Sequence, residues 1–267
     1  MDERVTHLPK EPGPFREFLG RFSTSMEQRI VGPVKYQETD HLGFMVLFFL
    51  SKQQTHARSI LTLEGSRDAL LIARSMIEGL FLLLWAERSP ADRALQWRGM
   101  SLVHDWRQLR AAREAGRSFD AAKWSETVER LQEHESLLLT SKAMAARARG
   151  EPLPADPYHR RWPPLPFKEV AKEVGSLVLY DGLYGHLAAY HHWEVAGLTG
   201  SLKRGENTVQ YSGANPVDET TSLICAISCL SQTAQIANDH HGIVLKGELE
   251  AFRAEALEIY QKHATRQ

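Results

Sequence analysis

The stretch SRDALLIARSMIEGLFLLLWAER, residues 66–88, decides the fold, because apolar side chains dominate it at helical spacing. We expect a helix in a hydrophobic core, with Ser66 as its N-cap. Arg74 and Glu78 interrupt this helix and, being four residues apart, lie one turn apart on one face. The large apolar residues next to them on that face are Leu70, Leu71, Phe81 and Trp85. Buried charges are costly unless they are paired and hydrogen-bonded, so the pair is expected to have a partner elsewhere in the chain or a ligand.

Helical periodicity continues through most of the chain and is broken by Pro and Gly. Ser89, Pro90 and Asp92 together form a helix-start signal, and Gly242 is a natural C-cap near the other end of the chain. Besides the helix at 66–88, the pattern predicts helices over residues 15–30, 39–63, 90–115, 120–149, 167–175, 176–195, 216–241 and 246–263.

Prolines mark the main division of this pattern. Six of the twelve prolines lie in EPLPADPYHRRWPPLP, residues 151–166, which cannot form a helix interior. We expect an extended connection or an ordered loop over the core, with Trp162 and Phe167 tucked into the core. Residues 199–215 are expected to form a loop with room for one small hairpin. The predicted fold class is all-α, a multi-helix bundle in a single domain of residues 1–267, with N-terminal helices in 15–149 and C-terminal helices in 167–263.

Composition favours a soluble protein without a strong charge bias. The 267 residues include 32 basic and 33 acidic side chains, so no global field favours nucleic acid or an anionic membrane. The longest apolar run, Leu42 to Leu50, is far shorter than the roughly 20 residues of a membrane helix, and the N-terminus has no signal-peptide pattern. Cys225 and Cys229 are four residues apart on one helix face, where the geometry does not suit a disulfide. We therefore expect a cytoplasmic protein with reduced core thiols and no membrane contact.

A second polar cluster lies in the helix expected over residues 176–195. Tyr180, Tyr184, Ala188 and the neighbouring His191 and His192 fall on roughly one face, and their donors and acceptors suit Arg74 and Glu78. One interpretation is a buried polar cross-link between two helices, and another is that one helix turns its polar stripe to water. A functional interpretation is a pocket in which Arg74 binds an anion and His192 or Glu78 moves a proton. The candidate ligand-binding residues are Arg74, Glu78, Tyr184, His191 and His192, and the candidate catalytic residues are Arg74, Glu78 and His192.

Two short motifs carry a resemblance to a known family. Arg74, Ser75 and Glu78 form an R-S-x-x-E run, and Tyr184, Leu187 and His192 form Y-x-x-L-x-x-x-x-H. Over roughly residues 40–240 the chain resembles a family of bacterial helical proteins catalogued only as a domain of unknown function. The chain departs from the family where Ala188 replaces a usual Ser and where Trp193-Glu194 replaces Pro-Ser. The resemblance implies a helical fold and a shared polar site, and it supplies no activity.

A ribonuclease of the helical HEPN type is an alternative. Such enzymes use an Arg to steady developing charge and a His a few residues later to handle protons, and Arg98 and His104 have this spacing, although Gly99 stands where a polar residue usually follows the Arg. The helix around them is basic, which indicates either a solvated amphipathic face, on which Arg107, Arg110 and Arg117 lie together, or a strip that contacts RNA. The arginines of such a strip are Arg93, Arg98, Arg107, Arg110 and Arg117.

No metal or cofactor is predicted. Two groups contain ligand types, the first made of His191, His192 and Glu194 and the second of Asp239, His240 and His241, but neighbouring histidines point about 100° apart on a helix. The chain has no H-E-x-x-H motif, no phosphate-binding glycine loop and no nucleophile elbow. Nothing in the sequence specifies an oligomeric state.

Three functional hypotheses follow. The first is a small-molecule or nucleotide-binding protein in a bacterial defence or stress system, a setting suggested by the company that such helical families keep. The second is a metal-independent ribonuclease that uses Arg98 and His104, or Arg74 and His192 brought together by folding. The third is a structural or interaction module. A pocket beside Arg74 favours the first, an exposed Arg/His pair the second, and a satisfied cluster without a pocket the third.

Overall fold

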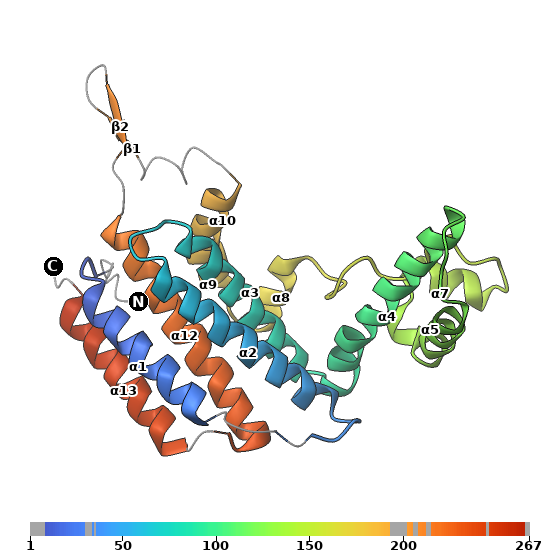
Figure 1. Cartoon of the computed structure of the whole chain (residues 1–267), viewed down its shortest axis with the longest axis horizontal. Coiled ribbons are helices and arrows are strands. Elements are labelled where there is room, and N and C mark those ends of the chain that lie inside the picture. The colour runs from blue at the N-terminus through green and yellow to red at the C-terminus, as the bar shows by residue number, and fades with distance from the viewer. Residues whose placement is uncertain are drawn as a thin grey trace.

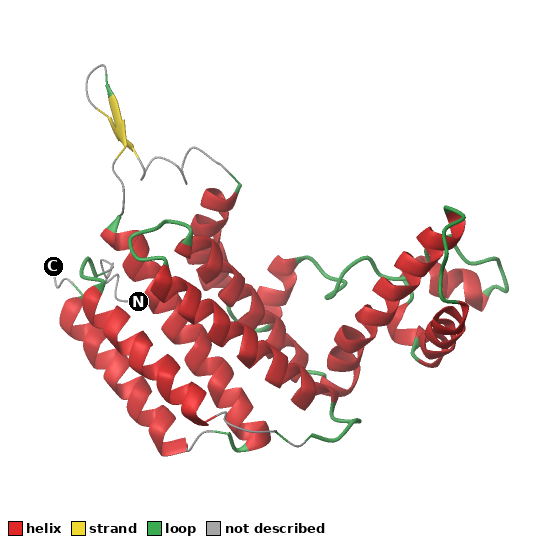
Figure 2. Ribbon diagram, viewed as in Figure 1, coloured by secondary structure: helices red, strands yellow, loops and turns green. Residues whose placement is uncertain are grey.

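Helices form the architecture, which confirms the predicted all-α class (Figure 2). The computed structural model describes residues 9–29, 34, 36–192, 202–204, 208–211, 215–243 and 246–264. Five long helices pack into a bundle at one end of the molecule (Figure 1). These are α1 (Gly13–Arg29), α2 (His41–Thr62), α3 (Ala69–Glu87), α12 (Pro216–His241) and α13 (Lys246–His263).

Helix α12 lies at the centre of this bundle, where it packs against α2, α3, α1 and α13. Its small side chains allow close approach from all sides, and Cys225 and Cys229 are buried as free thiols, as predicted. Three of its buried hydroxyls donate to the carbonyl one turn earlier: Thr220 bonds Pro216, Thr221 bonds Val217 and Ser222 bonds Asp218. Gly242 ends the helix in the left-handed conformation, with φ 61°, which confirms the predicted C-cap.

Helix α4 (Pro90–Glu114) leaves the bundle and carries a second, smaller hydrophobic core at its far end (Figure 1). The predicted continuous helix over 120–149 is wrong, because the chain breaks at His134 and again at Leu139–Thr140. Leu139 forms a β-bridge with Tyr158, and the Thr140 N–H donates to the carbonyl of Pro157. The resulting helices are α5 (Ala121–Glu133), α6 (Glu135–Leu138) and α7 (Ser141–Ala148). The buried residues of the second core are Leu102, Val103, Trp106, Leu131 and Leu138.

The Pro-rich connection returns the chain from the second core to the bundle. It contains no helix, as predicted, and its Trp162 ring packs edge-on against Trp85 at 5.5 Å between centroids. Phe167 stacks on Phe81 at 5.8 Å, so both aromatic anchors lie where the sequence predicts. Four short helical segments follow, namely α8 (Phe167–Glu173), α9 (Leu177–Leu179), the π-helical turn η1 (Tyr180–Tyr184) and α10 (Gly185–His191).

The structure differs from the predicted single helix over residues 176–195. A π-helical turn interrupts it, and residues 193–195 lie outside the described chain. Beyond them, β1 (Leu202–Arg204) and β2 (Val209–Tyr211) pair antiparallel, which confirms the small hairpin.

Two predicted helix caps act differently from the expectation. Helix α3 begins at Ala69, and the Ser66 hydroxyl accepts from the N–H of Asp68, at 3.2 Å, in the turn before it. Ser89 is the N-cap of α4, but its hydroxyl donates to Asp92, at 3.3 Å, and accepts no backbone N–H.

By length and composition alone α3 is apolar enough to cross a membrane. However, 56% of its most apolar window is buried within the bundle, and one such helix is a weak indication of a membrane protein.

Candidate functional site

The charged pair of α3 has a partner in the chain. Arg74 Nε donates to Glu78 Oε1 at 3.1 Å, and the Tyr184 hydroxyl donates to the same oxygen at 2.6 Å. Arg74 Nη2 donates to the Tyr184 hydroxyl at 3.1 Å. The side chain of Arg74 is 16% exposed and that of Glu78 is 36% exposed, so the pair is mostly but not fully buried. The three side chains form a closed triangle that joins α3 to η1.

Tyr184 is held in this triangle by aromatic packing. Its ring stacks on Tyr180 at 5.0 Å and contacts Phe167 at 5.2 Å. Burial and the hydrogen bond to Glu78 raise the pKa of Tyr184 to about 12, so its hydroxyl stays protonated and continues to donate at neutral pH. Among the described residues, Arg74 Nη1 is buried and has no hydrogen-bond partner. The triangle therefore leaves Arg74 Nη1, with its two N–H groups, without an acceptor in the part of the chain that the structure describes.

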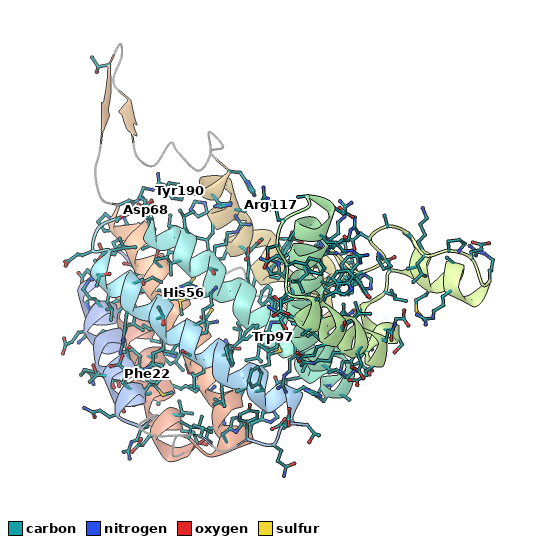
Figure 3. All side chains as sticks on the ribbon, turned by 45° about the vertical axis from the view of Figure 1, so that its right-hand side comes forward. Phe22, His56, Asp68, Trp97, Arg117 and Tyr190 are labelled. Carbon is teal, nitrogen blue, oxygen red and sulfur yellow. The ribbon has the colours of Figure 1, made fainter. Side chains whose placement is uncertain are left out.

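His191 and His192 do not join the triangle. Both are exposed at the end of α10, where their rings contact each other at 4.9 Å. The Tyr190 hydroxyl donates to Asp68 at 3.2 Å, which places this end of α10 beside the start of α3 (Figure 3). His192 follows Tyr184 by eight residues, or about 12 Å along a helix. The predicted contact of these histidines with Arg74 and Glu78 is therefore wrong. Residues on one helix face can still lie far apart along the helix axis.

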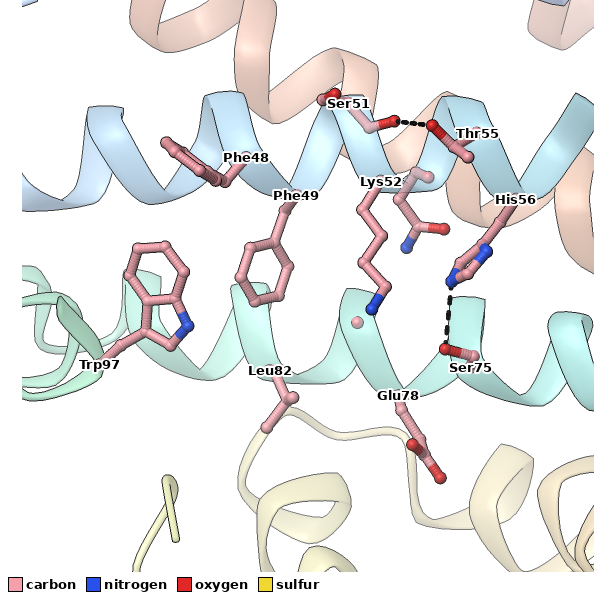
Figure 4. Close-up of a pocket in the computed structure, with 12 residues that line it drawn as sticks. Phe48, Phe49, Ser51, Lys52, Thr55, His56, Ser75, Glu78, Leu82 and Trp97 are labelled. Atoms are coloured by element: carbon pink, nitrogen blue, oxygen red, sulfur yellow. Dashed lines mark hydrogen bonds between the residues drawn. The ribbon is translucent and has the colours of Figure 1, made fainter. Parts of the chain in front are cut away.

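A groove of about 650 Å³ lies on the other flank of α3, between α3 and α2, and Trp97 of α4 closes one end (Figure 4). His56 lies toward the opposite end (Figure 3). Glu78 lines the groove and also belongs to the triangle, so the two features share one wall. The apolar residues of the groove are Phe48, Phe49, Leu82 and Trp97, and the main polar ones are Lys52, Gln53, His56, Ser75 and Glu78.

His56 and Ser75 face each other across this groove, with 3.2 Å between His56 Nε2 and Ser75 Oγ (Figure 4). The Ser75 hydroxyl thus bonds a side chain of another helix. The hydroxyl of Thr55, in α2, instead donates to the carbonyl of Ser51 in its own helix, at 3.0 Å. Burial, and then the charge of Lys52, lower the pKa of His56 below its ordinary value. At neutral pH the ring is therefore uncharged, with one nitrogen that donates and one that accepts.

Gln53 forms part of the groove floor. It is buried, and its Nε2 donates to the carbonyl of Met76 at 2.8 Å. Gly79 permits this close approach, because a Cβ there would lie 3.1 Å from Gln53 Nε2. Within the described part of the chain, Gln53 Oε1 is buried without a donor.

The alternative pair, Arg98 and His104, is not brought together. Arg98 Nη1 donates to the carbonyl of Glu38 at 2.9 Å, and its guanidinium lies 4.5 Å from the ring centroid of Phe44. His104 is exposed and contacts Gln108, with 2.7 Å between the side-chain nitrogens. Six residues rotate a helix by about 600°, so the two side chains leave α4 in different directions.

The basic residues of α4 are largely engaged within the chain. Arg93 pairs with Glu173 at 2.9 Å, Arg107 with Asp156 at 2.9 Å and Arg110 with Glu114 at 2.7 Å. Arg117 lies beyond the end of α4 and is exposed, so the predicted common face with Arg107 and Arg110 is wrong (Figure 3). These ion pairs reduce the positive field that a strip for RNA requires.

Within the described ranges, no three His, Cys, Asp or Glu side chains gather closely enough to hold a metal ion. His240 and His241 have ring centroids 6.3 Å apart, and Glu194 lies outside the described chain.

Sequence reasoning missed His56, Lys52 and Trp97 as site residues. A signal for His56 was present, because α2 turns from an apolar run to LSKQQTHARS while its helical periodicity continues. Gln53 and His56 fall where the packed face of α2 continues, and polar residues in such positions indicate a built site or a cross-link.

The comparisons with known proteins identify a family to which no function is assigned. A family model described as a family of unknown function, DUF5677, matches residues 44–209, a range that includes the whole groove and the Arg74–Glu78–Tyr184 triangle. No curated protein and no solved structure matches the chain.

Proposed function

Because the chain belongs to the DUF5677 family, a family of unknown function, we propose a function from the geometry of the site: the protein binds a small organic molecule in the groove between α2 and α3. The observation that carries this proposal is one concave space of about 650 Å³ in which an aromatic half adjoins a polar half. Ligand sites in proteins are typically of this size, mostly apolar, with a few polar groups that fix orientation.

The Arg74–Glu78–Tyr184 triangle holds Glu78, which lines one wall of the groove. Arg74 and Tyr184 both bond one oxygen of Glu78, which fixes the shared wall and ties α3 to η1. We assign the triangle a positioning role, so the cross-link and the binding site are parts of one arrangement. The ribonuclease hypothesis receives less support, since Arg98 and His104 leave α4 in different directions and about 12 Å of helix separates Tyr184 from His192.

The test uses variants that fill the groove from its open side. Thr55 is exposed and lines the groove, so Thr55→Trp should occupy the space without disturbing the core. Arg58 is exposed on the same helix and does not line the groove, so Arg58→Trp is the matched control. Small molecules that co-purify with the full chain are released by denaturation and identified by mass spectrometry. We expect retention by the wild type and by Arg58→Trp, and loss from Thr55→Trp; equal retention by all three proteins, or no retained compound, contradicts the proposal.

The cellular setting that we propose is the bacterial cytoplasm, in a defence or stress system. Two buried free thiols, Cys225 and Cys229, support a reducing compartment. The proposed defence role rests on the association of similar helical families with such systems. Phage plating on a host with and without the gene tests it, and equal plating at all multiplicities contradicts it.

A further inference from the structure

Lys52 supplies positive charge to the groove. The carboxylate of Glu78 is bonded by Arg74 and Tyr184 and points away from α2 (Figure 4). The Lys52 side chain instead extends from α2 toward α3, beside His56, and among the described residues no carboxylate pairs with it. Burial, and then the charge of Lys52, lower the pKa of His56, which agrees with a positive charge at the polar end of the groove. A ligand that brings negative charge there gains an ion pair that the chain lacks.

The other half of the groove offers aromatic surfaces. Trp97 meets Phe49 at 5.7 Å and an interplanar angle of 70°, and it meets Phe48 at 6.2 Å and 63°. In each of these edge-to-face pairs one ring covers only one face of the other, and Phe44 also packs against Phe48 at 4.6 Å and against Trp97 at 6.2 Å. Phe48 is 56% exposed, so its ring is open to solvent at the rim of the groove. A planar ring fits this half better than a branched aliphatic group does.

The spacing of the two halves limits the ligand. Lys52 follows Phe48 by one helical turn, or about 6 Å along α2, and His56 follows Phe49 by about 10 Å. A ring and a charged group joined by a short linker match this separation.

We propose that the groove binds an aromatic anion, with its ring against Phe48, Phe49 and Trp97 and its phosphate or carboxylate at Lys52. His56 and Ser75 donate or accept hydrogen bonds beside the anionic group. This inference rests on the proposed function, since it names the class of ligand that the same groove takes.

Calorimetric titration of the full chain with matched probes tests each part. The probes are 1-naphthyl phosphate, 1-naphthoate, 1-naphthylmethylammonium and inorganic phosphate. We expect one of the two aromatic anions to bind at least about tenfold more tightly than the aromatic cation and than inorganic phosphate, with an affinity that falls as salt rises. The tighter of the two anions identifies the acidic group, and either result supports the inference.

Variants of α2 then locate the charge. Lys52→Gln should weaken binding of the aromatic anion by roughly tenfold, because one charge-assisted contact is lost. Arg58→Gln removes the same charge from the same helix outside the groove and should change the affinity less than about twofold. Equal binding of anion and cation, equal effects of the two variants, or no binding of any probe overturns the inference. The proposed function is judged separately, by the compounds that Thr55→Trp loses and Arg58→Trp keeps.

Discussion

Glu78→Ala tests whether the triangle holds α3 to η1. The change removes the acceptor of Arg74 Nε, at 3.1 Å, and of the Tyr184 hydroxyl, at 2.6 Å. Arg74 then remains with a side chain only 16% exposed and two nitrogen positions without a partner, since Nη1 already lacks one among the described residues. Breaking a fully buried pair costs roughly 3–5 kcal/mol and breaking an exposed pair about 0–1. Because Glu78 is itself 36% exposed, we expect an intermediate loss of about 2 kcal/mol, or roughly 4–8 °C in Tm.

The matched control is Glu126→Ala. Glu126 pairs with Arg130 at 3.7 Å, also with i,i+4 spacing, but both side chains are more than half exposed. The gain in helix propensity is the same in both variants, so the difference between them isolates burial. Urea unfolding followed by circular dichroism should show a loss below about 0.5 kcal/mol for the control. If the two variants differ by less than about 0.5 kcal/mol, the triangle is solvated and our account of α3 is wrong.

Three further outcomes can be measured on the same protein. Burial raises the pKa of Cys225 to about 12 and also raises that of Cys229, so both thiols should react with Ellman's reagent only as the chain unfolds, and fast native labelling would place them at the surface. The pKa of His56 is lowered in the folded chain, so the stability it contributes is present above its ordinary value of 6.5 and is lost as pH falls through the folded pKa. His56→Gln should therefore reduce the fall in Tm between about pH 7 and pH 5, leaving the part due to His41 and His159, whose pKa values are also lowered; an unchanged slope contradicts this. Tyr184→Phe should cost about 1 kcal/mol, and a double-mutant cycle with Glu78→Ala should show coupling of similar size, whereas additive losses would mean that the two do not interact.

Local rules were enough for most of the fold. Apolar spacing predicted α3 and its neighbours to within a few residues, and the proline cluster predicted the non-helical connection with its two aromatic anchors. The break at Leu139–Thr140 was not predictable in this way, because it depends on pairing with Tyr158 and Pro157. A non-local backbone contact of this kind leaves little mark on local periodicity.

The site was predicted only in part, for a similar reason. Periodicity placed Arg74, Glu78 and Tyr184 on facing surfaces, and these three do meet. Periodicity could not predict the position of α10 along the axis of α3. This position depends on the π-helical turn and on the contact of Tyr190 with Asp68. His56 enters the site from a third element, α2, whose pairing with α3 is a property of the whole bundle.

Because α4 is shared between the two hydrophobic cores, the chain should open in two cooperative units. The first part of α4 is tied to the bundle by Arg93, which bonds Glu173, and by Trp162, which bonds the carbonyl of Arg93. The later part belongs to a core of five buried side chains, far fewer than the bundle holds. Backbone amides of α5, α6 and α7 should therefore exchange with deuterium at a lower opening free energy than those of α12. Trp97 lies on the tied part of α4, so the groove should outlast the opening of the smaller unit, and a bound ligand should slow exchange in α2 and α3 while leaving α5 unchanged.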